Sequence, residues 1–270
     1  MPVIPSPDQS QNKSAALLFG LNYSNVPGSN LKGCINDVQG MASLLKSTFR
    51  IQDVKICDDE SSYADTTLLG IVRNLNTLAL RSWSENLTFV WIHYSGHGSS
   101  VKDASADELD GKDECLVPSD FRTSGMLRDD EISVLLRRFN PKTHVVFSVD
   151  ACHSGTMGDL KYRWSSDRKA NVESTMAVCR APVLMLSGCR DNQMSSEESF
   201  AMPSGGMRAQ GAMTTVLLKA LKEDAAGCCG NVFVLTERLR SLLKAGGFSQ
   251  YPELTSSYDV SKDPVFFSRK

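Results

Sequence analysis

Short apolar runs alternate with amphipathic segments along most of this chain, and this alternation limits the possible folds more than any other feature of the sequence. The apolar runs are continuous, which is typical of strands buried on both faces. The segments between them repeat apolar residues at helical spacing. We expect strands at 15–21, 53–57, 87–95, 115–120, 144–150 and 181–188, and helices at 34–49, 65–83, 129–139, 211–223 and 234–246. Strands that alternate with helices predict a mainly parallel α/β sheet covered by helices on both faces.

The same pattern predicts one domain. A chain of 270 residues can bury a substantial core, and no internal repeat divides it. Residues 1–14 are rich in Pro and Ser and are expected to form a flexible tail before a single domain at 15–270. Residues 157–180 are polar and basic with little periodicity, which predicts an exposed linker loop between the regions 15–156 and 181–270.

Charge and composition argue against several kinds of partner. The formal net charge is only −2, so no global charge favours nucleic acid or an anionic membrane. No apolar run approaches the roughly 20 residues of a membrane-spanning helix. The eight cysteines contain no C-x-x-C pair and no disulfide framework spacing, which favours a reducing compartment. We therefore expect a cytoplasmic protein that binds neither membranes nor nucleic acid.

Two of the predicted strands end in residues capable of chemistry. His97 follows one strand in "WIHYSGHG", and Cys152 follows another in "FSVDACHSG". Ligands of open α/β sheets bind beyond the carboxyl ends of the strands, so neighbouring parallel strands would bring the imidazole and the thiol together. A Cys–His pair suffices for acyl transfer, because the imidazole takes the thiol proton and later protonates the leaving amine. The backbone N–H groups of Gly98 and Cys152 could hold the oxyanion.

Each of these residues has a simpler interpretation when taken alone. A single cysteine after an apolar strand is usually a buried, inert hydrophobe, and a Gly-His-Gly segment is often only a turn. The separation of 55 residues between His97 and Cys152 weakens both alternatives, because a histidine about 50 residues before the nucleophile is typical of caspases. The segment around Cys152 differs from the caspase signature, since an acid stands two residues before the cysteine instead of glutamine.

The chain resembles the metacaspases, the caspase-like cysteine peptidases of plants, fungi, protists and bacteria. The resemblance is carried by "HYSGHG" and "DACHSG", and by four further motifs in the order of that family: "LKGCINDVQGM" (31–41), "LSGCRDNQMSSE" (186–197), "GAMTTVLLKAL" and "QYPELTSS" (250–257). It implies a caspase-like three-layer α/β/α sandwich. It also implies a type I-like order of a large-subunit-like region before a small-subunit-like one, and a monomer.

The resemblance assigns roles to individual residues. His97 would be the general acid and base, and Cys152 the nucleophile. The primary specificity pocket would contain Asp37 and Asp150, with Cys34 and Ser95 beside them. A pocket lined by carboxylates favours a cation, so the substrate residue before the scissile bond is expected to be Arg or Lys. Asp37 has an alternative role as an acid that favours the start of helix 34–49.

An acidic stretch suggests a second site. Residues 100–131 contain ten acids and four bases, which on composition alone is typical of solvated surface. The oxygen-rich set suits Ca²⁺ better than zinc, although no EF-hand loop pattern is present. The resemblance implies calcium activation, and Asp113, Asp129, Asp130 and Asp159 match the family's ligands best. Asp110 or Asp107 could replace Asp113, and Asp129 and Asp130 could instead favour the start of helix 129–139.

These observations predict a calcium-activated cysteine endopeptidase that acts on proteins or peptides after Arg or Lys. If the enzyme cuts itself, basic residues in exposed sequence are the candidate sites: Lys161, Arg163, Arg168, Lys169 and Arg208. Two alternatives stay open at this point. The chain could be a catalytically silent relative that acts as a scaffold or regulator, or it could be a hydrolase that uses the same dyad on another amide or thioester.

Overall fold

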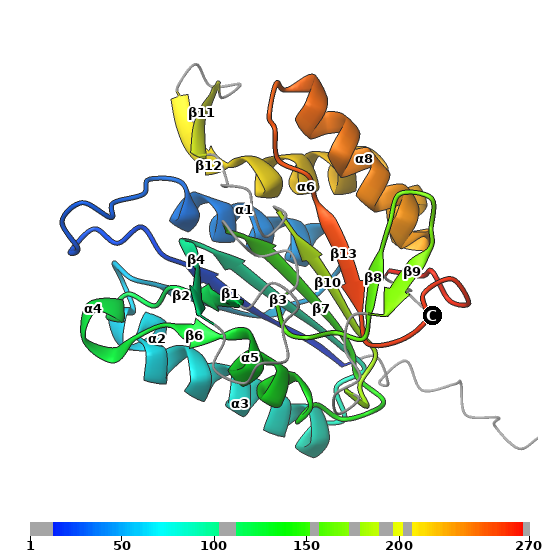
Figure 1. Cartoon of the computed structure of the whole chain (residues 1–270), viewed down its shortest axis with the longest axis horizontal. Helices are drawn as coiled ribbons and strands as arrows, with labels where there is room; N and C mark the ends of the chain where they lie inside the picture. The colour runs from blue at the N-terminus through cyan, green and yellow to red at the C-terminus, as the bar shows by residue number, and fades with distance from the viewer. Residues whose placement is uncertain are drawn as a thin grey trace, which may run out of the picture.

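The fold is built on an eight-stranded sheet, seen in a computed structural model that describes residues 13–102, 112–151, 157–172, 179–188, 197–201 and 207–266 (Figure 1). The strand order is β2-β1-β3-β7-β10-β13-β8-β9. The first five strands are parallel, and β13, β8 and β9 each run antiparallel to the preceding strand in that order. Their bounds are β1 Ser14–Gly20, β2 Asp53–Asp58, β3 Phe89–Ser95, β7 His144–Asp150, β8 Tyr162–Trp164, β9 Ala170–Val172, β10 Val183–Ser187 and β13 Glu253–Ser256.

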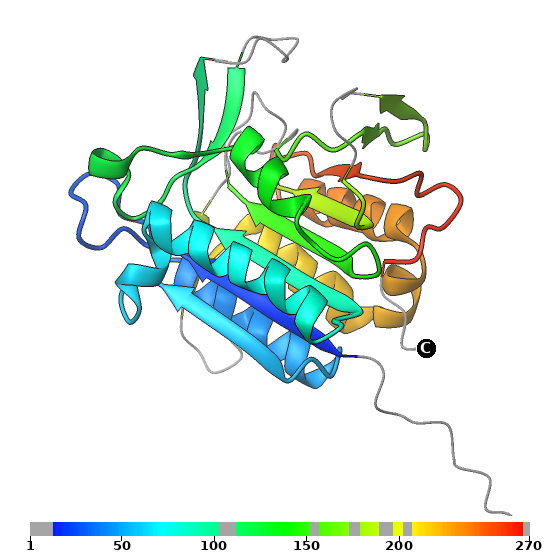
Figure 2. The ribbon, with the colours of Figure 1, turned by 90° about the horizontal axis from the view of Figure 1, so that it is seen from below.

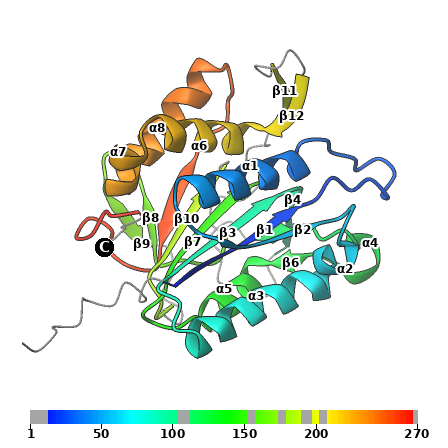
Figure 3. The same ribbon diagram turned by 180° about the vertical axis from the view of Figure 1, so that it is seen from behind.

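Helices cover both faces of this sheet. One face packs against α1 (Cys34–Ser47), α6 (Ala212–Glu223) and α8 (Val232–Ala245), which lie together in Figures 1 and 3. The other face packs against α3 (Leu68–Ser84) and α5 (Asp129–Leu136), which stand in front of the sheet in Figure 2.

Successive side chains of a strand point to opposite faces, so each central strand must be apolar at nearly every position. In β3, Trp91 joins the core beneath α1 and α6, whereas Val90 and Ile92 join the core beneath α3 and α5. The predicted α/β architecture with a mainly parallel sheet is confirmed.

Smaller elements surround the sheet. A three-stranded antiparallel sheet contains β4 (Gly98–Lys102), β5 (Lys112–Leu116) and β6 (Leu127–Arg128), and a two-stranded one contains β11 (Glu197–Ala201) and β12 (Met207–Gly211). Three short helices complete the described elements: α2 Tyr63–Thr66, α4 Phe121–Ser124 and α7 Ala225–Gly230. No helix within the described ranges combines the length and the apolar character needed to cross a lipid bilayer.

The structure corrects three sequence-based expectations about elements. The helix expected at 65–83 is two helices, because the Thr67 side chain accepts a hydrogen bond from Gly70 N and caps the start of α3. The strand expected at 115–120 is β5, which pairs with β4 and β6 outside the main sheet. The exposed loop expected at 157–180 contains β8 and β9, which extend the sheet from β13 and bury Trp164.

Candidate active site

The carboxyl ends of β3 and β7 lie side by side at the edge where the predicted site residues gather. Ser95 pairs with Asp150 in the parallel register, and Gly96 N donates to Asp150 O at 3.3 Å. His97 follows β3 and Cys152 follows β7, each two residues past its strand. Cys152 itself belongs to residues 152–156, which lie outside the described residues. The register therefore places the two strand ends side by side.

Backbone and aromatic contacts fix the orientation of His97. Its Nε2 lies 2.8 Å from the carbonyl oxygen of Ser29, in the loop between β1 and α1. A carbonyl oxygen can only accept, so Nε2 carries a proton, and in the neutral ring Nδ1 is the basic nitrogen. The ring of Tyr23 packs against the imidazole with 4.7 Å between the ring centroids. The backbone of His97 donates to Tyr23 Oη at 3.0 Å.

The loop that carries Tyr23 and Ser29 is itself held in place. Tyr23 has a φ of +54°, a left-handed conformation that is uncommon for a non-glycine residue. The carboxylate of Asp59 accepts hydrogen bonds from the backbone of Asn22 at 2.9 Å and of Tyr23 at 2.5 Å. Tyr23 Oη also donates to Val117 O at 2.6 Å, and burial holds the pKa of this phenol well above its usual value. The phenol therefore stays neutral beside His97.

Gly96 is required by close packing. A Cβ at this position would lie 2.8 Å from Tyr94 Oη and 2.9 Å from Tyr23 Oη, closer than real contacts allow. The residue between the end of β3 and His97 must therefore lack a side chain. Gly98, one of the two residues predicted to hold the oxyanion, begins β4 and pairs with Leu116.

Two buried carboxylates converge beside this edge from different elements. Asp37 comes from the first turn of α1 and Asp150 from the end of β7, and they are 0% and 4% exposed. Ser95 Oγ donates to Asp37 Oδ2 at 2.7 Å, and Gly211 N lies 3.1 and 3.0 Å from the two Asp37 oxygens. Thr214 donates to Asp150 Oδ2 from its backbone N at 2.7 Å and from Oγ1 at 2.8 Å.

Asp37, Ser95 and Asp150, three of the four residues predicted for the pocket, thus lie together. The fourth, Cys34, is the first residue of α1. Cys34 is buried, and its backbone N donates to Asn22 Oδ1 at 3.1 Å. The hydrogen bonds described for the Asp37 carboxylate reach β3 and Gly211 instead of the amides that begin α1. Asp37 also lies in the first turn of α1, where an acid favours the start of a helix, so both interpretations stay open.

Two of the predicted calcium ligands, Asp113 and Asp129, are buried. Asp129 is 2% exposed at the start of α5, and its carboxylate accepts from Glu114 N at 2.8 Å and from Asp130 N at 2.9 Å. Burial, followed by the negative charge of Asp159, raises the pKa of Asp129 to about 9. Asp113 is also buried, and Arg128 Nη1 lies 3.2 Å from its Oδ2.

The described acids do not by themselves form a ready metal site. No group of three or more Asp, Glu, His or Cys side chains in the described ranges stands ready to hold a metal ion. Asp107 and Asp110, the alternatives to Asp113, lie outside the described residues. Burial and the negative charge of Asp159 both favour the protonated form of Asp129, and a bound dication would instead favour the ionised form. Asp130 is half-buried next to it.

The candidate self-cleavage residues occupy different surroundings. Arg163 belongs to β8 and forms an ion pair with Glu253 at 2.6 Å. Lys161 is half-buried and lies over the ring of Tyr162. Arg168 and Lys169 are in the exposed turn between β8 and β9. Arg208 is in β12, and its side chain lies outside the description.

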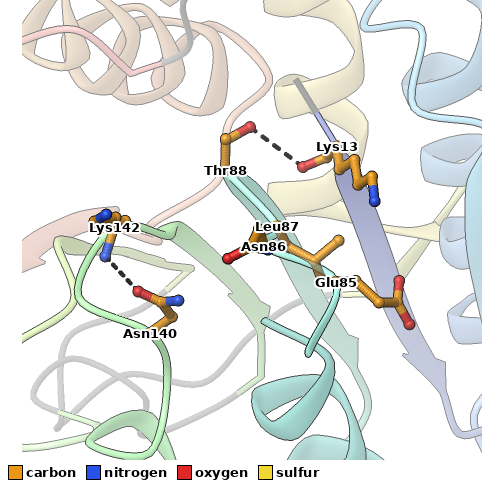
Figure 4. A pocket seen from close by; sticks show the side chains of 7 residues that line it. All are labelled: Lys13, Glu85, Asn86, Leu87, Thr88, Asn140 and Lys142. Carbon is orange, nitrogen blue, oxygen red and sulfur yellow. Dashed lines mark hydrogen bonds between the residues drawn. The ribbon is translucent and has the colours of Figure 1, made fainter. Parts of the chain in front are cut away.

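A cavity of about 420 Å³ lies elsewhere, at the amino ends of β1, β3 and β7 (Figure 4). Its lining residues come from the segments that precede those strands and from the end of α3: Lys13, Glu85, Asn86, Leu87, Thr88, Asn140 and Lys142. Ligands of parallel sheets bind at the opposite ends of the strands, so this cavity is separate from the candidate active site.

Sequence reasoning missed Ser29, Tyr23, Gly211 and Thr214. Ser29 acts through a carbonyl oxygen that every residue possesses, so no residue-type signal marks it. Gly211 and Thr214 belong to the "GAMTT" motif, which pointed to the segment without giving the role of either residue.

Comparisons with known proteins agree on one family. The family model described as "Metacaspase, peptidase C14 domain" matches residues 14–161. Metacaspase-2 of Trypanosoma brucei brucei is 32% identical over 267 residues, covering 93% of this chain and 75% of that protein. Metacaspase-2 of Arabidopsis thaliana is 33% identical over 237 residues, covering 81% of this chain and 54% of that protein.

Solved structures agree on the fold. A structural-genomics protein of Geobacter sulfurreducens superposes with a TM-score of 0.61 at 25% identity and covers 90% of this chain and 93% of its own. Caspase-1 of Spodoptera frugiperda superposes with a TM-score of 0.56 at 13% identity, covering 91% of this chain and 86% of its own. These two neighbours confirm the predicted caspase-like fold.

Proposed function

The chain belongs to the metacaspases of peptidase family C14 and is therefore a cysteine peptidase, and from this premise we propose that it cleaves protein or peptide substrates after Arg or Lys. In this proposal Cys152 is the nucleophile and His97 the general acid and base. The catalytically silent alternative finds no support in the chain, because the cysteine and the histidine are both present.

The observation that carries the proposed specificity is the convergence of Asp37 and Asp150. Both carboxylates are buried, and the donors described for them are hydroxyl and amide groups. These hydrogen bonds stabilise the negative charge of the two carboxylates. A guanidinium or ammonium group complements two neighbouring carboxylates, whereas an aspartate side chain would be repelled by them.

The orientation of His97 suits the proposed chemistry. Because Nε2 is directed to Ser29 O, Nδ1 is the nitrogen available to take the proton from the Cys152 thiol. The thiolate then attacks the carbonyl carbon of the scissile bond, and the backbone N–H groups of Gly98 and Cys152 stabilise the oxyanion. The protonated Nδ1 donates its proton to the leaving amine, and a water molecule hydrolyses the acyl-enzyme in the second half of the reaction.

Fluorogenic peptides that differ only in the residue before the scissile bond test this proposal. We expect cleavage after Arg and Lys and none after Asp, because only a cation complements the two carboxylates. Cys152→Ala should reduce the rate to the background of the assay, which separates this enzyme from a contaminating peptidase. A preference for Asp would refute the specificity, and full activity of the alanine variant would refute the role of the nucleophile.

We also propose calcium as the activator, with Asp113, Asp129, Asp130 and Asp159 as candidate ligands. Calcium would neutralise the Asp129–Asp159 pair, and it would take no part in bond cleavage. Asp159 lies seven residues after Cys152, so a metal ion bound by this acid would lie close in sequence to the nucleophile.

A calcium titration of wild type and two variants tests this part of the proposal. Asp129→Asn should abolish the rise in peptidase rate that calcium produces in the wild type. Asp53→Asn, a change at an exposed acid paired with Arg81, should leave that rise intact. Equal responses of Asp129→Asn and wild type would exclude Asp129 as a ligand. Self-cleavage at basic residues, a monomeric state and a cytoplasmic location stay predictions of the sequence.

A further inference from the structure

Helix α6 begins without a capping side chain of its own. Its N-cap residue is Gly211, which has no side chain to accept from the first amides of the helix. These amides must find acceptors elsewhere, because the start of any helix leaves its first N–H groups without intrahelical partners. Two of the acceptors are the pocket acids: Asp37 accepts from Gly211 N, and Asp150 accepts from Thr214 N. The start of α6 is thus capped by carboxylates from α1 and β7.

Thr214 makes a stronger connection than the helix backbone alone. Its backbone N and its Oγ1 both donate to the same oxygen, Asp150 Oδ2, at 2.7 and 2.8 Å. The side chain of Thr214 is fully buried. Two donors on one oxygen restrict the rotation of the Asp150 carboxylate. The other oxygen, Oδ1, lies beside Gly188, the residue after β10: a Cβ added to that glycine would be 3.4 Å from Oδ1.

Gly211 leaves the space that the two carboxylates need. A Cβ at Gly211 would lie 2.2 Å from Asp150 Oδ2 and 2.8 Å from Asp37 Oδ2. Both acids therefore border the same small volume, and any side chain there would displace at least one of them. The close approach of this backbone places the start of α6 directly against both acids.

We propose that Thr214 is a positioning residue for cation recognition: it orients the Asp150 carboxylate, while the start of α6 does the same for Asp37. This inference rests on the proposed preference for Arg and Lys and extends it to a residue 64 positions away from Asp150 in the chain. Thr214 acts through Asp150, so its side chain need not touch the substrate.

The chain offers a matched control on the same helix. Thr215 has a buried Oγ1 for which the described residues provide no hydrogen-bond partner. Thr214→Val and Thr215→Val make the same chemical change one residue apart, and only the first removes a donor from a pocket carboxylate. Thr214→Ser restores the hydroxyl and serves as the conservative variant.

Steady-state kinetics on Arg- and Lys-ended peptides across pH tests the inference. Thr214→Val should raise KM for both peptides by about tenfold with kcat nearly unchanged, because a hydrogen bond to a charged group is lost from ground state and transition state alike. The acidic limb of kcat/KM should move to higher pH, since removing a donor from a carboxylate favours its protonated form. Thr215→Val should match the wild type, and Thr214→Ser should recover most of the loss.

The outcomes separate this inference from the proposed function. Cleavage after Arg and Lys by the wild type reports on the function alone, and a wild type that cuts after neither would overturn both. If the wild type cuts after Arg and Lys but the two valine variants behave alike, the role of Thr214 is refuted and the function stands. A fall in kcat with unchanged KM and an unmoved acidic limb would mean that Thr214 serves only the packing of α6.

Discussion

At the scale of single residues, the candidate site depends on groups that hold the chemical residues in place. Tyr23 is the clearest case, because its hydroxyl accepts from His97 N at 3.0 Å and donates to Val117 O at 2.6 Å. The same ring packs on the imidazole at a centroid distance of 4.7 Å. One side chain therefore joins the loop before α1, the end of β3 and the segment after β5.

Tyr23→Phe separates the hydroxyl of Tyr23 from its ring. We expect a loss of about 1–2 kcal/mol in the free energy of unfolding, because Val117 O and His97 N lose a buried partner. The peptidase rate should fall as well, through kcat, since the imidazole is less firmly oriented. Denaturant unfolding and peptide kinetics measure the two effects. Tyr63→Phe, which changes a tyrosine that is 44% exposed, is the control and should alter neither. An unchanged kcat in Tyr23→Phe would contradict the orienting role.

Some residues of the candidate site can be predicted from the sequence, and others cannot. Asp150 ends one continuous apolar strand and His97 follows another, so their position at one sheet edge follows from the pattern. Ser29 and Thr214 could not be found in this way. Ser29 contributes only a backbone oxygen to His97, and Thr214 reaches Asp150 through a contact that exists only after α6 has packed beside β7.

At the scale of elements, sequence predicts the central strands well and the edge of the sheet poorly. The expected strand at 144–150 coincides with β7, because a strand covered on both faces must be apolar throughout. The strands β8 and β9 have three residues each, and β9 is exposed along its length. β8 pairs with β13, which is distant in sequence, and β9 pairs with β8 alone at the edge of the sheet, so neither short strand carries the continuous apolar pattern of a buried strand.

The β8–β9 hairpin changes which basic residues are plausible self-cleavage sites. A peptidase needs an exposed segment that can extend into its active site. Arg163 is paired within the sheet, whereas Arg168 and Lys169 are in the exposed turn. We therefore expect self-cleavage, where it occurs, after Arg168 or Lys169. Intact-mass measurement before and after incubation with calcium would identify the fragments.

Variants decide whether this turn is the site that is cut. Replacing Arg168 and Lys169 together by Gln should remove the fragments, while Lys161→Gln, a change just before β8, should leave them. Cys152→Ala should abolish them in every background, because the cut requires the enzyme's own nucleophile. Fragments that end at Arg208 instead would show that β12 is more accessible to the active site than the β8–β9 turn.

At the scale of the whole molecule, the two helical layers are joined by a sheet that contains buried ionisable groups. His93 is 1% exposed in β3, and its Nδ1 lies 2.8 Å from Ser148 Oγ on the neighbouring strand. Burial lowers the pKa of His93 to about 3 and that of His144 to about 4. Both histidines are neutral in the folded protein at moderately acidic pH, whereas they become charged in the unfolded chain below about pH 6.5.

This difference makes the whole fold sensitive to acid. The unfolded chain binds more protons than the folded protein below about pH 6.5, so the free energy of unfolding should decrease as the pH falls from 6.5 toward the folded pKa values near 4 and 3.

His93→Gln removes one of these proton-binding groups and should flatten the decrease by on the order of 1–3 kcal/mol between pH 6.5 and 4. His144→Gln should flatten the same range independently, because His144 lies opposite Phe89, four residues along β3 from His93. Urea unfolding at a series of pH values measures both slopes, and carboxylates contribute equally to every variant, so differences from the wild type isolate the histidines. Parallel curves for wild type and His93→Gln would show that this imidazole takes up its proton in the folded state, which would require the core between α1 and β3 to open before the protein unfolds.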